Sequence, residues 1–392
     1  MPNATALLDE RSIVDTLAAL VRINSITNHE QAIADWMANH LAAIGLRDVT
    51  RLPVPESGDT VLGWIDGPAD GPTFCLNFHL DTFGVFNGWT TNPFEPVIDG
   101  DRMYGLGVHD MKAGGACILA AAGALVKSAA PLRGRVLIAC TTDEENWSRG
   151  AHALIASGAL RGCIGALVPE PTPYGSLRIG ARGRHVITIH LKGRSAHIAF
   201  EDPLAINSAH DAARVIAVLA DTPGLGLRED PLFGLRSGLG VTGVHSGGEM
   251  ILVPEEARII VDRHLLPGET LEEALVHLRG LIARAGIGGT CTLTWDKRPT
   301  PAPGAFVVPP EGDFVRTVRR IQEVELGRPV DLTIARSVAD VNHIAVHGGV
   351  PTLTCGPWGG NTCAANEWVD LAALLPVARI HVETVLAMLA KP

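Results

Sequence analysis

Short apolar runs with the character of β-strands alternate with helix-like segments in the first half of the chain, and this alternation constrains the fold more than any other feature. The runs are bounded by turn residues and span Thr60–Ile65, Thr73–Phe78, Arg135–Thr141 and Ile164–Val168. Between the second and third runs lies the alanine-rich segment Met111–Val126, whose composition favours helix. Strands that alternate with helices form a mostly parallel sheet covered by helices. The sequence therefore predicts an α/β fold.

Two helices are expected before the first strand. Residues Ser12 to Asp15 have the pattern of a capping box, and apolar residues at helical spacing follow it. A second helix is expected from Glu30 to Ile44, where Gly45 supplies the usual C-terminal breaker.

The pattern changes near Gly180. Strand-like and helix-like segments then follow in the order β-α-β-α-β: Val186–Leu191, Ala205–Leu219, Ala257–Val261, Leu271–Ala285 and Thr290–Trp295. Prolines end this region, and the α/β pattern resumes with a helix, a strand and a terminal helix: Phe314–Leu326, Pro351–Cys355 and Leu371–Ala390. We therefore expect a catalytic domain at 1–179 and 299–392, interrupted by a small inserted α+β domain at 180–298.

Composition and charge limit the classes of partner. Asp and Glu outnumber Lys and Arg by 42 to 32 and no basic cluster offsets the net charge of -10, so a nucleic-acid surface is not expected. The uncharged stretch Ala113–Val126 is shorter than the roughly 18 apolar residues of a membrane span. The apolar patch Ala4–Leu8 runs into charged residues and is no signal-peptide core. Seven cysteines without a Cys-x-x-Cys pair indicate free thiols, so we expect a soluble, cytoplasmic protein without a membrane partner.

Acidic and metal-capable side chains follow three of the expected strands directly. These segments are His79-Leu80-Asp81, Asp143-Glu144-Glu145 and Glu170. Ligand sites in open α/β sheets lie at the carboxyl ends of strands, so the three groups are expected to converge. Asp110 stands at the expected start of the 111–126 helix, where a carboxylate can cap free backbone N–H groups.

Taken singly, each group has an ordinary structural role, such as a helix cap for Asp110 or a hydrogen-bonded core histidine for His79. Gathered at one edge, the carboxylates would repel one another, and a bound dication is the simplest neutraliser. One imidazole with several oxygens suits zinc. Two metals sharing a carboxylate would clamp water and substrate, with Asp110 as the natural bridge. Of Glu144 and Glu145, one can ligate while the other serves as general base.

Six linked motifs follow one another in order between residues 79 and 172: His79-Leu80-Asp81, Gly88-Trp89-Thr90, Asn92-Pro93-Phe94, Gly105 to Lys112, Asp143-Glu144-Glu145 and Glu170-Pro171-Thr172. Together they resemble the co-catalytic zinc aminoacylase and carboxypeptidase family, which includes acetylornithine deacetylase, succinyl-diaminopimelate desuccinylase and glutamate carboxypeptidase. The resemblance implies a zinc-exopeptidase-like sheet with an inserted lid or dimerisation domain.

The resemblance also implies a role for each residue of the cluster. His79, Asp110 and Glu170 would hold one zinc, and Asp110 would bridge to a second zinc held by Glu145. Glu144 is similar to the family's general base. Asp81 resembles the carboxylate that orients the histidine ligand.

In the inserted domain, Gly193–His197 is similar to the segment whose histidine stabilises the oxyanion. In dimeric members of the family this histidine reaches into the partner's active site, so the resemblance implies a homodimer formed through the inserted domain. The edges of a small sheet also tend to be paired or covered. Without the resemblance, His197 is equally well explained as a surface histidine at a strand end.

Substrate contacts depart from the family pattern. Ile251 stands where the family usually has a substrate-binding asparagine, and His264 replaces an arginine that often holds a substrate carboxylate. Arg182 and Arg184 would supply charge instead, or else are solvated strand-edge residues. Trp358, in the last motif, is also assigned to the substrate.

The last motif carries the largest departure. The family usually has a histidine here as the remaining ligand of the second zinc, whereas the stretch Gly356–Glu367 contains none and Cys363 occupies the matching place. A thiolate at Cys363 would suit zinc. Alternatively Cys363 is a buried small hydrophobe, and Thr362 or Asn361 gives weak oxygen ligation.

We expect a metal-dependent hydrolase that cleaves an amide-type C–N bond of a small molecule, as a deacylase or carboxypeptidase. Two zinc ions per chain are expected, with cobalt or manganese as alternatives. Two other hypotheses stay open: a specialised enzyme with one metal or none, and a non-catalytic binder of small molecules. About two metals per chain would favour the two-zinc hydrolase, about one would favour the specialised enzyme, and none would favour the non-catalytic binder.

Overall fold

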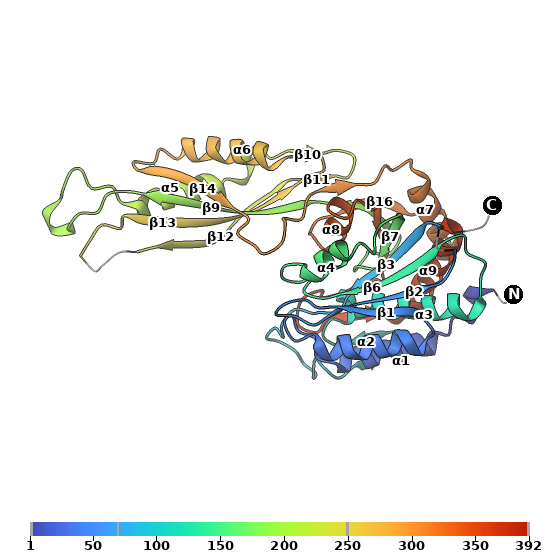
Figure 1. Cartoon of the computed structure of the whole chain (residues 1–392). Helices are drawn as coiled ribbons and strands as arrows, with labels where there is room; N and C mark the ends of the chain where they lie inside the picture. Colours follow the sequence, from blue (N-terminus) through green and yellow to red (C-terminus); the bar gives the residue numbers. More distant parts are fainter. Residues whose placement is uncertain (1–2, 69, 248–250, 390–392) are drawn as a thin grey trace. The chain divides into compact units, whose positions relative to one another are not determined.

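The computed structural model describes residues 3–68, 70–247 and 251–389 and separates into two compact units (Figure 1). Unit 1 comprises Met1–Gly180, Val307–Ile334 and Ala339–Pro392. Unit 2 comprises Ala181–Phe306 and Ala335–Val338.

Unit 1 is built on a nine-stranded sheet in the order β1-β2-β6-β3-β7-β17-β8-β15, with β16 also paired to β8. The central strands β6, β3, β7 and β17 are parallel, and β1, β2 and β8 pair antiparallel at the sides. The α/β class is therefore confirmed, with the parallel pairing concentrated at the centre. The strands are β1 Arg47–Leu52, β2 Thr60–Ile65, β3 Thr73–His79, β6 Arg135–Thr141, β7 Cys163–Val168, β8 Ser176–Ala181, β15 Phe306–Val307, β16 Asp331–Ala335 and β17 Thr352–Thr354.

Helices cover both faces of this sheet. Phe74 of β3 packs edge-on against Phe314 of α7, with ring centroids 5.8 Å apart. Cys75, the next residue, belongs instead to a buried cluster with Leu154 of α4 and Ile344 of α8. Successive residues of a strand face opposite sides, so α7 and the α4–α8 pair lie on different faces. The helices are α1 Glu10–Arg22, α2 Gln31–Ala43, α3 Ala113–Ser128, α4 Arg149–Ser157, α7 Asp313–Leu326, α8 Asp340–Val346 and α9 Leu374–Met388.

Single turns of other helix types flank these elements: η1 Ala4–Leu7, η2 Val108–Lys112 and η5 Leu371–Ala373. The stretches Val108–Ser128 and Leu371–Met388 are long and apolar enough to cross a membrane by length and composition alone. Their windows are 83% and 50% buried inside the protein, as core helices of a globular fold are, so they are weak grounds for a membrane span.

A second sheet of unit 1 has the order β18-β19-β5-β4. Its strands are short: β4 Val97–Asp99, β5 Arg102–Tyr104, β18 Gly359–Gly360 and β19 Trp368–Asp370. Because β19 pairs with β5, the chain after residue 356 lies beside the chain that leads into α3. This pairing brings the last sequence motif to the loop that carries Asp110.

Unit 2 is an antiparallel sheet in the order β12-β13-β9-β14, with α5 and α6 packed on it. Its core joins Ile187 and Ile189 of β9 to Val215 of α5 and Leu278 of α6. The elements are β9 Gly183–Lys192, η3 Ile198–Phe200, α5 Ser208–Ala220, η4 Thr222–Leu225, β10 Glu229–Asp230, β11 Leu235–Arg236, β12 Gly238–Ser246, β13 Glu256–Leu265, α6 Leu271–Arg284 and β14 Thr290–Trp295.

Two local expectations differ from the structure. Helix α1 begins at Glu10 with Asp9 as its N-cap, because the Asp9 carboxylate accepts the N–H of Ser12. A capping box that starts at Ser12 is therefore wrong by one turn. Residues 299–306 and 335–338 cluster with unit 2, where the N–H of Arg184 binds the carbonyl of Pro303. The end expected for the last helix, Ala390, lies outside the described residues.

Candidate active site

Three parallel strands of unit 1 deliver the predicted polar residues to one edge. β3 ends at His79, β6 ends at Thr141 directly before residues 142–145, and Glu170 follows the end of β7 by two residues. Gly114, at the start of α3, permits a close approach to this edge. A Cβ there would lie 2.4 Å from the carbonyl oxygen of Pro169.

The imidazole of His79 is the centre of the cluster. Its Nε2 lies 3.2 Å from Asp110 Oδ1 and 4.0 Å from both Glu144 Oε2 and Glu170 Oε1. Its Nδ1 lies 3.0 Å from the backbone carbonyl of Asp81, to which it can donate. A ring that donates one N–H to a carbonyl and turns its other nitrogen to acidic groups is arranged as metal-ligating histidines are.

Asp81 fixes the loop after β6. Its Oδ1 and Oδ2 accept the N–H groups of Glu144 and Glu145, each at 3.1 Å, and Oδ2 also accepts the hydroxyl of Thr27. The Asp81 carboxylate is 3.6 Å from His79 Nδ1, farther than its own backbone carbonyl. Asp81 therefore holds the imidazole through its main chain and positions the two glutamates through its side chain.

Asp110 does not cap a helix. α3 starts at Ala113, and the backbone of Asp110 has φ −113° and ψ 94°. The buried carboxylate of Glu367 accepts the N–H groups of Gly107, His109 and Asp110 at 2.8–2.9 Å. Because these backbone donors are satisfied by Glu367, the Asp110 side chain stays turned toward His79.

Cys363 stands next to Asp110. Its thiol donates to Asp110 Oδ2 at a distance of 3.2 Å, and its backbone adopts the left-handed conformation with φ 53°. Burial, together with Asp110 and Glu145, raises the pKa of this thiol. The position expected for the missing histidine is thus occupied by a sulfur in contact with the expected bridging carboxylate.

Three glutamates of the site favour their protonated forms, whereas the hydrogen bond with His79 lowers the pKa of Asp110 against the effect of burial. Burial raises the pKa of Glu144 and Glu145, and burial together with Asp110 raises that of Glu170 to about 8. Burial would lower the pKa of His79, but the carboxylates of Asp110 and Asp81 outweigh it and raise that pKa well above its usual value. Such pKa shifts are expected where several acidic groups are crowded together in a buried site.

The donor set fits a divalent metal. His79, Asp110 and Glu145 offer ligand atoms that all lie within 4.8 Å of one another. Oε1 of Glu145 and Oε1 of Glu170 are buried and have no hydrogen-bond partner among the described residues. Buried oxygens without a donor are costly unless a cation binds them. One imidazole, three carboxylates and a thiol are ligands that zinc accepts.

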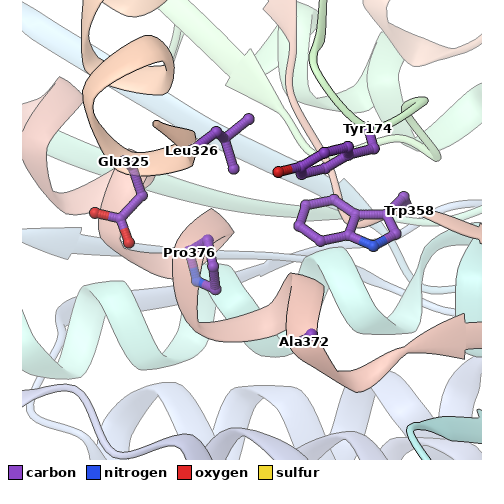
Figure 2. Close-up of a pocket in the computed structure, with 6 residues that line it drawn as sticks. All are labelled: Tyr174, Glu325, Leu326, Trp358, Ala372 and Pro376. Atoms are coloured by element: carbon purple, nitrogen blue, oxygen red, sulfur yellow. The ribbon is translucent and has the colours of Figure 1, made fainter. Parts of the chain in front are cut away.

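Trp358 lines a different pocket of unit 1. This cavity of about 300 Å³ is bounded by Tyr174, Glu325, Leu326, Trp358, Ala372 and Pro376, none of which belongs to the cluster around His79. Figure 2 shows the Tyr174 ring beside Trp358, and the ring centroids are 4.6 Å apart. The indole N–H of Trp358 donates to Asp370.

The other expected substrate residues and His197 belong to unit 2. Arg184 forms an ion pair of 2.6 Å with Asp262, whose other oxygen lies 3.1 Å from His264 Nδ1. Arg182 donates to the backbone carbonyls of residues 236 and 336. Ile251 is 53% exposed, and its carbonyl accepts the N–H of Ile198.

His197 has a defined tautomer if neutral. Its Nδ1 accepts the N–H of Ala199 at 3.2 Å, so the ring proton is assigned to Nε2. The ring lies near that of Phe200, with centroids 4.7 Å apart. An imidazole held in this way can donate a hydrogen bond through Nε2.

Sequence reasoning missed three residues of this site. Glu367 was noted in the last motif without the backbone clamp that the structure gives it. Asp340, the first residue of α8, is 1% exposed, and burial raises its pKa to about 6. Arg178 of β8 acts electrostatically on Glu170 and His109. In the sequence, all three residues are charged side chains within segments that are otherwise apolar or loop-like, and this feature could have marked them as candidates for the site.

The fold and this cluster together define a metallohydrolase of the α/β class that acts on amide or peptide bonds. The chain belongs to peptidase family M20/M25/M40, whose profile matches residues 75–387. The resemblance drawn from the motifs is thereby confirmed.

Curated relatives of this family match over most of their length. The chain is 30% identical over 378 residues to a succinyl-diaminopimelate desuccinylase of Methylobacterium sp. strain 4-46, with 92% of each chain covered. It is 28% identical to the enzyme of that name from Rhodospirillum centenum, with 92% of this chain and 93% of the relative covered.

Solved structures share the fold at lower identity. A tripeptidase from Staphylococcus aureus superposes with a TM-score of 0.80 at 19% identity, covering 97% of this chain and 98% of the other. A dinuclear metal-binding peptidase of family M20 from Bacillus subtilis gives 0.73 at 17% identity, covering 98% and 99%.

Proposed function

We propose that this metallohydrolase cleaves the amide C–N bond of a small molecule with Glu144 as general base and two metal ions per chain. One observation carries the division of roles between the adjacent glutamates. Among the described residues, Glu145 joins His79 and Asp110 in a group of potential ligand atoms within 4.8 Å, and neither Glu144 nor Glu170 does. Glu170 is kept as a ligand because its buried Oε1, like Oε1 of Glu145, has no hydrogen-bond partner there, whereas no Glu144 oxygen is in that position. Glu144 is left at 4.0 Å from His79, within reach of a water at the site.

The metal ligands we propose are His79, Asp110 and Glu170 for one ion, and Asp110, Glu145 and Cys363 for the other. Zinc suits this set, and cobalt or manganese are alternatives. When bound, such ions polarise the amide carbonyl and make water a stronger nucleophile at neutral pH.

Glu144 accepts a proton from the attacking water and returns it to the leaving amine. Burial raises the pKa of its carboxyl above the usual range, and a raised pKa makes a carboxylate a better base and its conjugate acid a useful donor near neutrality. Asp81 keeps Glu144 in place because it binds the Glu144 backbone N–H at 3.1 Å. The Glu144 side chain therefore carries the proton from the attacking water to the leaving amine.

His197 stabilises the developing oxyanion through Nε2–H. The support for this role is the Ala199 N–H bond to Nδ1, which leaves the other nitrogen as donor. Of the remaining unit 2 residues, we propose that Arg182, Arg184, Ile251 and His264 contact the substrate, and we leave out Trp358 because it lines the separate cavity of unit 1. The relatives' names suggest an N-acyl amino acid, such as a succinylated amine, or a small peptide.

The test is a panel of N-acyl amino acids, N-succinyl amines, dipeptides and aryl amides, assayed with added zinc, cobalt and manganese. We expect hydrolysis of at least one class and about two metal ions per chain by elemental analysis. About one metal with activity would support the specialised one-metal enzyme instead. Absence of both metal binding and turnover would support a non-catalytic binder of small molecules.

We also propose that the protein is a homodimer joined through unit 2. β12 is an edge strand of the unit 2 sheet, and Val244 on it is 48% exposed. Ile198 and Phe200, beside His197, are 65% and 79% exposed. Edges and apolar patches of this kind tend to be covered. Light scattering at micromolar concentration should give twice the chain mass, and a monomer would contradict the proposal.

The state of the cysteines supports a proposal for the cellular compartment of the protein. All seven are free, and burial raises the thiol pKa of Cys75, Cys117, Cys140 and Cys355, which makes them unreactive. Free thiols persist in reducing compartments, so we propose the cytoplasm. Expression of a tagged chain followed by cell fractionation tests this, and recovery outside the cytoplasmic fraction would contradict it.

A further inference from the structure

We propose that Arg178 holds a carboxylate of the substrate, so that the anionic anchor lies in unit 1 beside the metal ligands rather than in unit 2. This inference rests on the proposed amide hydrolysis and names the class of substrate: an amide that carries a carboxylate on its acyl or amine part.

The position of Arg178 follows from strand register. Arg178 of β8 is paired with Thr354 of β17, and Thr354 is paired with Val168 of β7. Residues paired across neighbouring strands point to the same face of the sheet, and so does a residue two positions farther along a strand. Glu170 follows Val168 by two residues. The Arg178 side chain therefore starts on the same face of the sheet as that of Val168, and its electrostatic interaction with Glu170 and Asp110 shows that it lies near these proposed ligands.

Arg178 is a cation without a partner. Across residues 3–68, 70–247 and 251–389, its guanidinium makes neither a hydrogen bond nor an ion pair, although the side chain is partly buried. The comparable arginines are paired: Arg149 with Asp143 at 2.7 Å, and Arg263 with Glu269 at 2.8 Å. No Arg178 nitrogen is among the buried side-chain atoms that lack a partner in the described part of the chain, so water reaches the guanidinium in the free protein and a substrate carboxylate can take its place.

Charge explains why the partner should come from the substrate. Arg178 feels the carboxylates of Glu170 and Asp110, which favour its charged form against the effect of burial on its pKa. Those carboxylates are proposed metal ligands, and two dications would cancel the charge of three carboxylates and a thiolate. Once the metals are bound, the positive charge of Arg178 is no longer compensated. A planar guanidinium then binds a carboxylate well, through two parallel hydrogen bonds.

The cations of unit 2 are less suited to this task. Arg184 is committed to Asp262 through two nitrogens, at 2.6 and 2.8 Å. His264 shares the same Asp262, at 3.1 Å. Ile251 has no polar group to offer. Arg178 is thus a guanidinium close to the proposed metal ligands that no acid already holds, whereas Arg184 and His264 both contact Asp262.

The experiment compares matched substrates that differ only in a carboxylate: an N-succinyl amine with its N-butanoyl analogue, and an N-acetyl amino acid with its amide. The variants are Arg178→Met, Arg178→Lys and, as control, Arg161→Met at an exposed position of unit 1. We expect Arg178→Met to raise KM for the anionic member of each pair by about 10–100-fold, the cost of a charged hydrogen-bonded pair, and to leave the neutral member unchanged. Arg178→Lys should recover part of the preference.

A second readout does not depend on turnover. Calorimetry of succinate with the zinc-loaded protein should show binding to the wild type that Arg178→Met weakens by about 10–100-fold, with metal content unchanged. Equal loss for anionic and neutral substrates, an unchanged preference, or equal succinate affinity in wild type and Arg178→Met would overturn the proposal. If the wild type hydrolyses no member of either pair, the proposed function fails, and the succinate measurement alone decides on Arg178.

Discussion

The Cys363 thiol donates a hydrogen bond of 3.2 Å to Oδ2 of Asp110, while Oδ1 of the same carboxylate faces His79 Nε2 at 3.2 Å. One carboxylate therefore connects a histidine on β3 with a cysteine that lies 253 residues farther along the chain than Asp110. In this hydrogen bond the sulfur acts as a thiol donor, at the position where the family resemblance implies a metal-ligating histidine. Metal binding would have to displace this proton, because only the thiolate ligates.

Cys363→His is expected to keep or raise zinc occupancy at the second site. A thiol must lose its proton before it can bind zinc, and the pKa of the Cys363 thiol is raised, whereas a neutral imidazole can bind directly. Cys363→Ser should lower occupancy toward one metal per chain, because a hydroxyl is a poor ligand. Elemental analysis after dialysis at controlled free zinc measures both. If neither variant changes metal content, Cys363 is not a ligand and acts as a small side chain packed on Asp110.

Glu144→Gln is expected to reduce turnover by on the order of 10²–10⁴-fold with unchanged metal content, because the general base is lost and the proposed metal ligands remain. Glu145→Gln is the matched control from the next position. Since Glu145 lies in the potential ligand group, its variant should lose metal as well as activity. Wild-type turnover in Glu144→Gln would remove Glu144 from the mechanism.

Glu367→Gln should weaken metal binding by about 10–100-fold, the usual cost of disturbing a residue that orients ligands. The Glu367 carboxylate accepts three backbone N–H groups, including that of Asp110. An amide offers one oxygen and turns an N–H₂ group toward a donor, which shifts the loop that carries Asp110. Chelator competition measures the affinity, and Glu311→Gln at an exposed position is the control. Equal affinities would mean that the loop holds its conformation without this clamp.

The sequence predicted the cluster around His79 because three of its segments end or closely follow an apolar strand, and a strand that ends in acidic residues is a pattern visible without structure. The clamp by Glu367 was not visible, because it depends on β19 pairing with β5 across more than 250 residues, and no local pattern encodes such a pairing. Arg178 escaped notice for a related reason. Within Ser176–Ala181 only the register against β17 shows which face it occupies.

Edge strands were also missed, and their composition explains why. β1 has only two apolar residues in six and β12 contains three glycines in nine residues, so neither shows the apolar run on which strand prediction relies. Both lie at the edge of a sheet, where one side of the strand has no neighbour to pack against. β2, β6 and β14 lie where the sequence placed them, to the residue.

Acid should destabilise the fold through His381 in a definite pH window. This residue of α9 is fully buried, its Nε2 lies 3.2 Å from the carbonyl of Cys355, and its Nδ1 has no hydrogen-bond partner among the described residues. Burial lowers the pKa of the imidazole to about 4. The unfolded chain has a pKa near 6.5, so between about pH 6.5 and pH 4 the unfolded state binds more protons than the folded state.

Stability is therefore fully retained above about pH 6.5 and is lost as the pH falls toward 4, by about 3 kcal/mol from this residue. His381→Gln keeps an N–H donor for the Cys355 carbonyl but cannot be protonated. We expect its free energy of unfolding in urea to fall less steeply than that of the wild type from pH 7 to pH 4.5. His29→Gln, at an exposed position, should follow the wild type. Parallel pH profiles for wild type and His381→Gln would show that His381 stays neutral in the unfolded chain too, or that the folded protein accommodates its charge.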